Sequence, residues 1–238
     1  MRLPVIAALG LSLCGFQIAL AADNSATLSN ETDRISYTLG ADMGSNFRNN
    51  KIDINADVLY QGLKDGMAGG DLKLTKEQME QTLTNFQNQL QQSRQAAFTA
   101  LSEKNLKEGE AFLAKNKTAD GVTALPNGLQ YRVIKAGTGD MPKAGDMVTV
   151  NYEGRFVDGT VFDSSFKRGR PATFPVSGVI PGWQEALKMM KKGGSWEVFI
   201  PASLGYGKQG IGGVIGPNET LIFKVDLLDV KAKKAQQS

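Results

Sequence analysis

Residues 148–156 read Val-Thr-Val-Asn-Tyr-Glu-Gly-Arg-Phe, with an apolar or aromatic residue, or glycine, at every second position. This period of two is typical of a strand that buries one face. Asp158-Gly159 follows and is a turn signal between antiparallel strands. Further strands are predicted at residues 129–133, 195–200 and 220–230, the first and last with the same alternation. We therefore predict an antiparallel sheet for the C-terminal half of the chain.

A single short helix is expected among these strands, over residues 182–190. Pro181 precedes it, and proline is favoured in the first turn of a helix, where its missing N–H is not needed. Gly193-Gly194 follows and ends the helix. A sheet with one helix packed on it makes this half of the chain an α+β domain. Residues 119–127 contain glycine, proline and polar side chains, and are predicted to be the linker before it.

A long helix is predicted to precede this linker, over residues 74–118. Thr75 and Gln78 form a capping box at its start, and no proline interrupts it. At 1.5 Å per residue such a helix is about 60 Å long. Apolar residues recur with helical spacing at its start and become sparse beyond Gln91. We therefore expect one face to be buried near its beginning and a nearly polar surface later, as in a rod that connects two domains.

Residues 22–73 are predicted to form a small helical module. Ile35 begins a stripe of apolar residues four apart, and two glycines lie on the adjacent stripe, which indicates close approach of another backbone. A second helix is expected over residues 55–67. So short a module buries little core by itself, so we predict a homodimer; a poorly packed helical appendage is the alternative. The residues predicted for the dimer interface are Leu39, Gly40, Met43, Gly44 and Phe47.

Residues 1–21 are predicted to be an export signal. Arg2 supplies a positive start, residues 3–20 are almost wholly apolar, and Ala19-Leu20-Ala21 fits a signal-peptidase site. A retained membrane anchor is the alternative, because the apolar stretch is nearly long enough to span a bilayer. Cleavage near Ala21 would remove Cys14, the one cysteine of the sequence.

The composition excludes several kinds of chemistry. The sequence has no histidine, which rules out Ser-His-Asp and Cys-His triads and histidine-ligated zinc. We expect neither a metal nor a cofactor. The net charge of +3 is spread along the chain without a basic cluster, so no nucleic-acid partner is expected. The basic residues near the C-terminus belong to a solvated tail, residues 232–238.

Six aromatic residues of the C-terminal half stand on different predicted elements. They can form a pocket, although ordinary core packing is the alternative for each. Trp183 directly follows a Pro-Gly step, which we expect to present its ring at the surface. Tyr206 lies between two glycines and is a candidate hydrogen-bond donor to a substrate carbonyl, as is the Ile180 N–H. The six residues are Tyr152, Phe162, Phe174, Trp183, Tyr206 and Phe223.

The C-terminal stretch resembles the FK506-binding-protein (FKBP) family of prolyl isomerases over roughly a hundred residues. The motifs that carry the resemblance are Val148-Thr-Val-Asn-Tyr-Glu-Gly, Gly159-Thr-Val-Phe-Asp-Ser, Phe174, Val179-Ile-Pro-Gly-Trp, Gly205-Tyr-Gly and Gly216-Pro-Asn-Glu-Thr-Leu-Ile-Phe. The resemblance implies a half-barrel sheet wrapped on a short helix over residues 128–231. It also implies peptidyl-prolyl cis–trans isomerase activity on proline-containing polypeptides, and inhibition by macrolides such as FK506 and rapamycin.

The resemblance further assigns the site residues. Trp183 is implied as the pocket floor, and Asp163 as its one carboxylate; an ordinary turn or surface aspartate is the alternative for Asp163. The residues implied in catalysis are Asp163, Tyr206, Phe162, Trp183 and Phe223. The residues implied in binding substrate or macrolide are Tyr152, Phe162, Asp163, Phe174, Val179, Ile180, Trp183, Tyr206 and Phe223.

The remainder of the chain resembles one subgroup, the macrophage-infectivity-potentiator (Mip) proteins of Gram-negative bacteria. The matching pieces are Ile35–Gly44, the helix after Thr75, and Gly109–Leu113. The subgroup implies export to the periplasm, outer membrane or cell surface, dimerisation through the N-terminal module, and a chaperone role in folding. A holdase chaperone or virulence factor that depends little on isomerisation is the alternative function. The glycine-rich loop after Tyr206 departs from the family pattern, which leaves substrate preference and macrolide affinity open.

Overall fold

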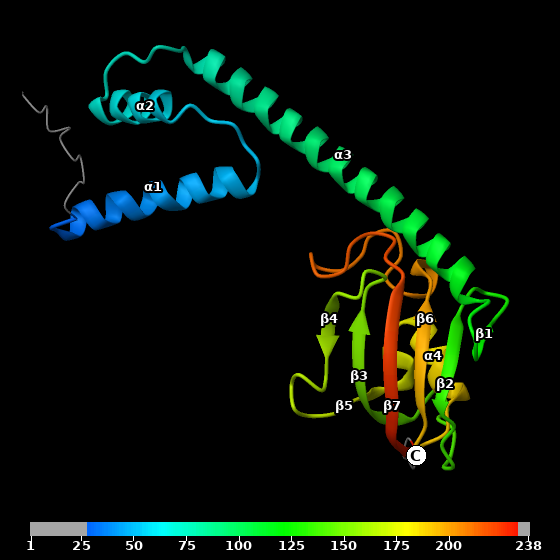
Figure 1. Cartoon of the computed structure of the whole chain (residues 1–238). Helices are drawn as coiled ribbons and strands as arrows, with labels where there is room; N and C mark the ends of the chain where they lie inside the picture. The colour runs from blue at the N-terminus through cyan, green and yellow to red at the C-terminus, as the bar shows by residue number, and fades with distance from the viewer. Residues whose placement is uncertain (1–27, 233–238) are drawn as a thin grey trace, which may run out of the picture. The chain divides into compact units, whose positions relative to one another are not determined.

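The computed structural model describes residues 28–232, which fold as two compact units, one up to Thr75 and one from Lys76 onward (Figure 1). The predicted signal peptide, residues 1–21, lies outside the described residues, as do residues 233–238 of the predicted tail. Within the described part of the chain, no helix combines the length and the apolar character needed to cross a membrane.

The first unit contains two helices, α1 (Glu31–Asn49) and α2 (Ala56–Ala68), as predicted. Asn30 and Asn55 cap their N-termini through side-chain oxygens that accept backbone N–H groups. Neither helix has a buried residue, so this unit forms no core of its own within one chain. The large apolar side chains that remain exposed include Ile35, Tyr37, Leu39, Met43, Val58, Leu59, Tyr60, Leu63 and Met67.

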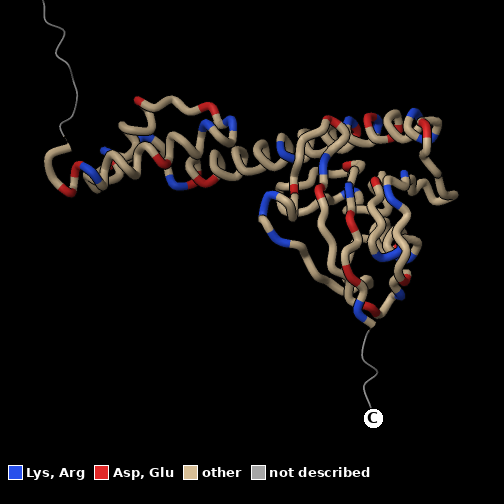
Figure 2. The backbone as a smooth tube through the Cα atoms, turned by 60° about the horizontal axis from the view of Figure 1, so that its bottom comes forward, with Lys and Arg blue, Asp and Glu red and all other residues tan. Residues whose placement is uncertain are grey.

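The second unit begins with α3 (Lys76–Asn116), a helix of 41 residues that is about 60 Å long. The expectation that its beginning is the buried part is wrong within a single chain, because its buried residues are Asn105 and Gly109, near its end. The end of α3 packs on the sheet, where the rings of Phe112 and Phe199 lie 5.9 Å apart between centroids. Basic and acidic residues are mixed along the last turns of α3 (Figure 2), as expected of a helix with a solvated outer face.

A seven-stranded antiparallel sheet forms most of the second unit. Its strand order is β1-β2-β6-β7-β3-β4, and β5 pairs with β3 on the side where β4 also pairs. The strands are β1 (Val122–Ala124), β2 (Gln130–Lys135), β3 (Met147–Arg155), β4 (Val161–Ser164), β5 (Ala172–Pro175), β6 (Ser195–Ile200) and β7 (Leu221–Lys231). The predicted α+β fold with an antiparallel sheet is therefore confirmed.

Residues 119–127, predicted as a linker, contain a strand. β1 pairs with β2 in the register Val122 to Arg132 and Ala124 to Gln130, so the sheet begins earlier than the predicted boundary at residue 128. Three residues are too few to show an alternating pattern, which is why the sequence does not reveal this strand. The four-residue strands β4 and β5 went unpredicted for the same reason.

The core lies between one face of the sheet and the helix α4 (Pro181–Met189), which runs behind the strands in Figure 1. Pro181 occupies the first turn of α4, as predicted. Gly182 has no room for a side chain, because a Cβ there would lie 2.6 Å from the Ile200 side chain, so the helix sits directly on β6. The largest fully buried core side chains are Leu129, Leu187, Met190, Ile200, Leu221 and Leu227.

Replacing Leu187 by alanine is expected to lower the free energy of unfolding by about 2–5 kcal/mol, because it removes buried methyl groups and leaves a cavity. Leu187 is 1% exposed on the inner face of α4. Urea unfolding followed by tryptophan fluorescence measures the change. Lys188→Ala, at the neighbouring exposed position, is the matched control and should stay within about 0.5 kcal/mol of the parent protein. An equal loss in both variants would contradict the place of Leu187 in the core.

Candidate active site

A cavity of about 260 Å³ opens between β3, β4, β5, α4 and the start of β7. It brings together all nine residues that the sequence analysis placed in a pocket, and adds Gly178 to them. The lining residues are Tyr152, Phe162, Asp163, Phe174, Gly178, Val179, Ile180, Trp183, Tyr206 and Phe223. Residues that are up to 71 positions apart in the sequence, from Tyr152 to Phe223, thus surround one space of the size of a small ring system.

Trp183 lies at the centre of the aromatic packing. Its ring meets those of Phe223, Tyr152 and Phe174 edge to face, at centroid distances of 5.1, 5.3 and 5.6 Å. The expectation that the Pro-Gly step presents this ring at the surface is wrong, since Trp183 is only 5% exposed. It belongs to the hydrophobic core and lines the cavity at the same time, because α4 begins beneath the cavity and points its first turn at the sheet.

Gly154 on β3 makes the opposite wall possible. A Cβ at this position would lie 2.6 Å from both the Phe162 and the Phe223 rings. Those two rings therefore pack against bare backbone, 5.6 Å apart between centroids and nearly perpendicular. The close approach of these two pocket rings thus explains why residues 148–156 have a glycine at position 154.

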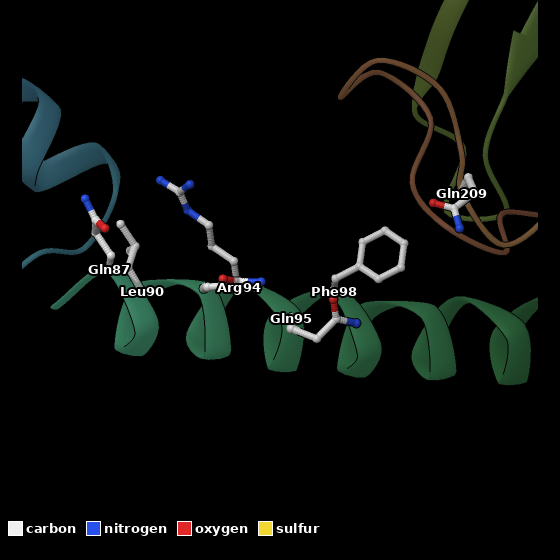
Figure 3. A pocket seen from close by; sticks show the side chains of 7 residues that line it. Gln87, Leu90, Arg94, Gln95, Phe98 and Gln209 are labelled. Atoms are coloured by element: carbon white, nitrogen blue, oxygen red, sulfur yellow. The ribbon is translucent and has the colours of Figure 1, made fainter. Parts of the chain in front are cut away.

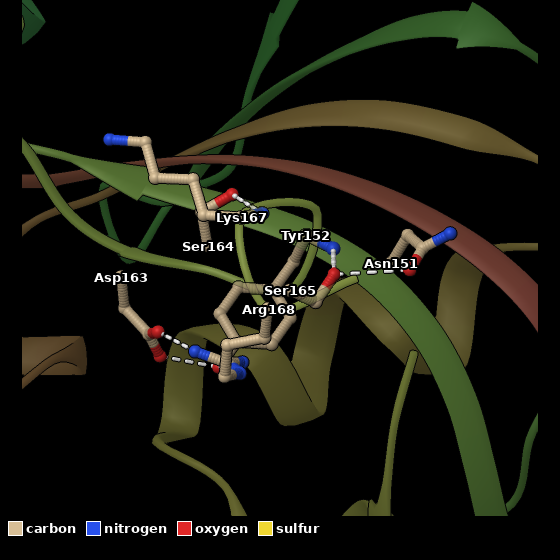
Figure 4. Close-up of polar contacts among 7 residues, drawn as sticks. All are labelled: Asn151, Tyr152, Asp163, Ser164, Ser165, Lys167 and Arg168. Carbon is tan, nitrogen blue, oxygen red and sulfur yellow. Dashed lines mark hydrogen bonds and ion pairs between the residues drawn. The ribbon is translucent and has the colours of Figure 1, made fainter. Parts of the chain in front are cut away.

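Asp163 is hydrogen-bonded on two sides (Figure 4). The Tyr152 hydroxyl donates to one of its carboxylate oxygens and the Arg168 guanidinium to the other. A second N–H of Arg168 donates to the Tyr152 hydroxyl at 2.9 Å, which closes a triangle of three side chains. Ser165 supports this triangle through the backbone, because its hydroxyl accepts the Tyr152 N–H at 2.8 Å. Asp163 is therefore a fixed acceptor at the pocket rim, oriented by its neighbours.

Arg168 is the contributor that sequence reasoning missed. It lies in the loop between β4 and β5. In the sequence it is one of three basic residues in the run Lys167-Arg168-Gly169-Arg170, and nothing distinguishes it from the other two. The position five residues after Asp163 was the available signal. Without knowledge of the turn between them, that spacing does not distinguish an ion pair from a solvated loop.

The electrostatics keep the carboxylate charged and the phenols protonated. Burial alone would raise the pKa of Asp163, but the hydrogen bonds from Tyr152 and Arg168 outweigh it and hold that pKa below its ordinary value. Burial raises the pKa of Tyr206, and the negative charge of Asp163 raises it further. Burial likewise raises the pKa of Tyr152. At neutral pH the site therefore holds one anion and neutral hydroxyl donors.

Two hydrogen-bond donors at the cavity are available to a ligand. Among residues 28–232, neither the Tyr206 hydroxyl nor the Ile180 N–H has a hydrogen-bond acceptor. Ile180 is the residue before Pro181, so its N–H lies outside the hydrogen-bonding pattern of α4, while its carbonyl accepts from Trp183 and Gln184. Such donors can hold the carbonyl groups that flank a bound ring.

The isomerase activity is expected to be nearly independent of pH between about 5 and 9. Asp163 has a lowered pKa and stays charged above its ordinary value of 3.8, while both pocket tyrosines have pKa values raised above 10.0. The sequence contains no histidine that could titrate in this range. The measurement is kcat/KM for a proline-containing peptide across this pH range. A sigmoidal change centred near pH 6 or 7 would contradict a charged Asp163 beside two neutral phenols.

A second, larger cavity of about 660 Å³ lies along α3 (Figure 3). Three glutamines of α3 line it together with Leu90, Arg94 and Phe98, and Gln209 borders it from the loop that follows Tyr206. Its lining is mainly polar, and it has one aromatic side chain, Phe98, against the packed rings of the smaller cavity. We therefore place the chemistry in the aromatic cavity, although it is the smaller of the two.

The fold and the aromatic cavity define a class of protein: an antiparallel sheet wrapped on one helix, with a cavity lined largely by aromatic side chains. Residues 139–228 match the family model of the FKBP-type peptidyl-prolyl cis-trans isomerase. Residues 32–133 match that of the domain amino terminal to FKBP-type peptidyl-prolyl isomerase. Together with the relatives described next, these matches show that the chain belongs to the FKBP-type peptidyl-prolyl cis–trans isomerase family.

The relatives narrow the family to the predicted Mip-like subgroup. The chain is 52% identical to "Outer membrane protein MIP" of Legionella longbeachae, over 97% of this chain and 98% of that protein. It is 48% identical to "Peptidyl-prolyl cis-trans isomerase Mip" of Coxiella burnetii, over 92% and 95%. The crystal structure of FkpA from Escherichia coli superposes with a TM-score of 0.70 at 40% identity, and covers 85% of this chain and 98% of that one. The predicted family, subgroup and enzyme class are confirmed.

Proposed function

We propose that the aromatic cavity accelerates rotation about X–Pro bonds in exported polypeptides, without a covalent intermediate. The observation that carries this proposal is the convergence of packed aromatic rings, two available donors and one fixed carboxylate on a space of about 260 Å³. A prolyl ring fits such a space, and its flanking carbonyls reach the donors at the rim.

The chemistry follows from the amide bond itself. Rotation is slow because resonance gives the C–N bond partial double-bond character, with a barrier of about 20 kcal/mol. The twisted amide at the transition state has lost that resonance and carries less separated charge. An apolar cavity that excludes water therefore destabilises the planar amide relative to the twisted one. Differential binding of this kind requires no nucleophile, general base or metal.

Each pocket side chain has a role in this scheme. Trp183 is the floor under the prolyl ring, and Phe162 and Phe223 form the wall that Gly154 makes possible.

The polar groups of the cavity hold the peptide on either side of the ring. Tyr206 and the Ile180 N–H donate to the carbonyls on either side of the ring. Asp163, held by Tyr152 and Arg168, faces the rotating carbonyl carbon. The remaining walls are Phe174, Val179 and Ile180.

A protease-coupled assay of a short X–Pro peptide tests this function. The full-length protein is expected to accelerate cis-to-trans conversion, and an FK506- or rapamycin-type macrolide is expected to compete for the same cavity and suppress it. Acceleration that a saturating macrolide leaves unchanged would place the reaction elsewhere. No acceleration at all would refute the proposed activity.

We further propose that the chain works as an exported homodimer with a chaperone role in folding. Apolar side chains of α1 and α2 are exposed in a single chain, which supports a partner for this unit. A Cβ placed on Gly40 or Gly44 would meet no heavy atom within 4 Å, so the faces of these two glycines are open to a second backbone. The relative named as an outer membrane protein supports export. A holdase or virulence factor that is independent of isomerisation is less favoured, because the aromatic cavity is complete.

A further inference from the structure

The segment after Tyr206 is fastened at both of its ends. Residues 207–217 form a glycine-rich loop that leads to β7. At its start the Gly207 N–H donates to the Ala202 carbonyl at 2.9 Å. At its end the Asn218 N–H donates to the Gly207 carbonyl, also at 2.9 Å. Gly207 directly follows Tyr206 in the chain. The two hydrogen bonds of Gly207, one through its N–H and one through its carbonyl, therefore fix the backbone that carries the Tyr206 phenol.

Asn218 is itself held by α3. Its φ of 55° lies in the left-handed region, which asparagine tolerates better than most residues. Its side-chain Nδ2 donates to the Ser102 hydroxyl at 2.7 Å and, less closely, to the Ser102 carbonyl at 3.4 Å. The long helix therefore determines where the closing residue of the loop sits.

Asn105, one turn further along α3, holds the preceding residue. Its Nδ2 donates to the Pro217 carbonyl at 2.8 Å, and Asn105 is only 7% exposed. A buried amide with a single specific acceptor is costly to leave unpaired, so this contact is specific rather than incidental. Pro217 and Asn218 are thus fastened to two positions on one face of α3.

Gly109 brings the helix close enough for these bonds. A Cβ at this position would lie 2.2 Å from the Thr220 Oγ1, where β7 is about to begin. Thr220 is 4% exposed. The spacing of Ser102, Asn105 and Gly109 by three and four residues keeps all three on one helical face. That face runs along the segment 217–220.

We propose that Ser102 and Asn105 of α3 are positioning residues for the isomerase site, which act on the Tyr206 donor through Asn218, Pro217 and Gly207. This inference rests on the proposed function of the aromatic cavity. A hydrogen bond weakens steeply with misalignment, and small displacements of a catalytic group lower rates severely. A helix outside the cavity therefore tunes the rate because it fixes the loop that carries the donor.

Full-length variants test this proposal. Ser102→Ala and Asn105→Ala are each expected to lower kcat/KM for a proline peptide about three- to tenfold, the effect of one lost hydrogen bond. Ser102→Thr keeps the hydroxyl and should restore the parent value. Ser93→Ala and Asn88→Ala, at exposed positions of the same helix, are the matched controls and should leave kcat/KM unchanged. If Asn105→Ala fails to fold, Ser102→Ala carries the test.

A double-mutant cycle separates positioning from a general loss of structure. In a Tyr206→Phe background, Ser102→Ala should change kcat/KM less than about 1.5-fold, because its effect passes through the missing hydroxyl. Equal effects in both backgrounds would overturn the proposal, as would a parent-like kcat/KM for Ser102→Ala.

A readout that does not depend on activity completes the test. In protein labelled with ¹³C-tyrosine, the ring signals of Tyr206, assigned from the Tyr206→Phe variant, should shift in Ser102→Ala and return in Ser102→Thr. Unchanged signals would overturn the inference. Shifted signals in a protein that does not accelerate X–Pro rotation would uphold the positioning of Tyr206 and refute the proposed function alone.

Discussion

Asp163→Leu is expected to lower kcat/KM for a proline-containing peptide by about tenfold, the largest effect of any single polar change at the site. The substitution removes the acceptor shared by the Tyr152 hydroxyl and the Arg168 guanidinium, and leaves both donors without it at the pocket rim. It also removes the carboxylate that the proposed function places against the substrate. The side chain of Asp163 is 40% exposed, so we expect the free energy of unfolding to change little.

Two further variants divide the effect between its causes. Asp140→Leu makes the same chemical change at an exposed loop position and should leave kcat/KM at the parent value. Arg168→Met keeps the carboxylate but removes the cation that orients it. A loss in Arg168→Met as large as that in Asp163→Leu would assign the effect to orientation, and a smaller one would assign part of it to the carboxylate itself. Parent-like activity of Asp163→Leu would contradict its role.

The second large effect concerns assembly. Leu39→Glu combined with Met43→Glu is expected to convert full-length protein from the proposed dimer to a monomer, because two carboxylates would be placed in the apolar face of α1 that we propose to be the dimer interface. Leu39 is 62% exposed and Met43 is 46% exposed in one chain, so a folding defect within the chain is not expected. Light scattering should report twice the mass of one chain for the parent protein and the mass of one chain for the variant.

Ala41→Glu is the matched control for this change, since residue 41 points away from residues 39 and 43 on the helix. It should remain dimeric. The variant that loses the dimer should retain isomerase activity on a short peptide, because every residue of the aromatic cavity lies between Tyr152 and Phe223. A parent protein that is monomeric in solution would contradict the proposed assembly.

The parts of the fold that were predicted correctly have strong local patterns. Strand β3 alternates over its nine residues and strand β7 over its first seven, from Leu221 to Leu227, which is long enough for the period of two to stand out. The pocket residues could be named from motifs, because the resemblance spans six separate stretches in order. Their convergence on one cavity depends on strand pairing between β3, β4 and β7, which no local pattern encodes.

The parts that were missed depend on contacts distant in sequence. The buried face of α3 is made by Asn105 and Gly109, a polar and a small residue that a search for apolar stripes passes over. Trp183 was expected at the surface because a Pro-Gly step suggests a turn, whereas Gly182 in fact lets α4 sit on Ile200 and buries the ring. Arg168 was missed because its partner is defined only once the turn after β4 is known.

The most direct test of catalysis in the aromatic cavity is two-dimensional exchange NMR on an X–Pro peptide at equilibrium, with catalytic amounts of the full-length protein. We predict exchange cross-peaks between the cis and trans signals that disappear when a macrolide of the FK506 type is added in stoichiometric amount to the protein. Bound peptide should also shift the indole signal of Trp183. Exchange that persists with the macrolide bound, or that leaves the Trp183 signal unmoved, would contradict catalysis at this site.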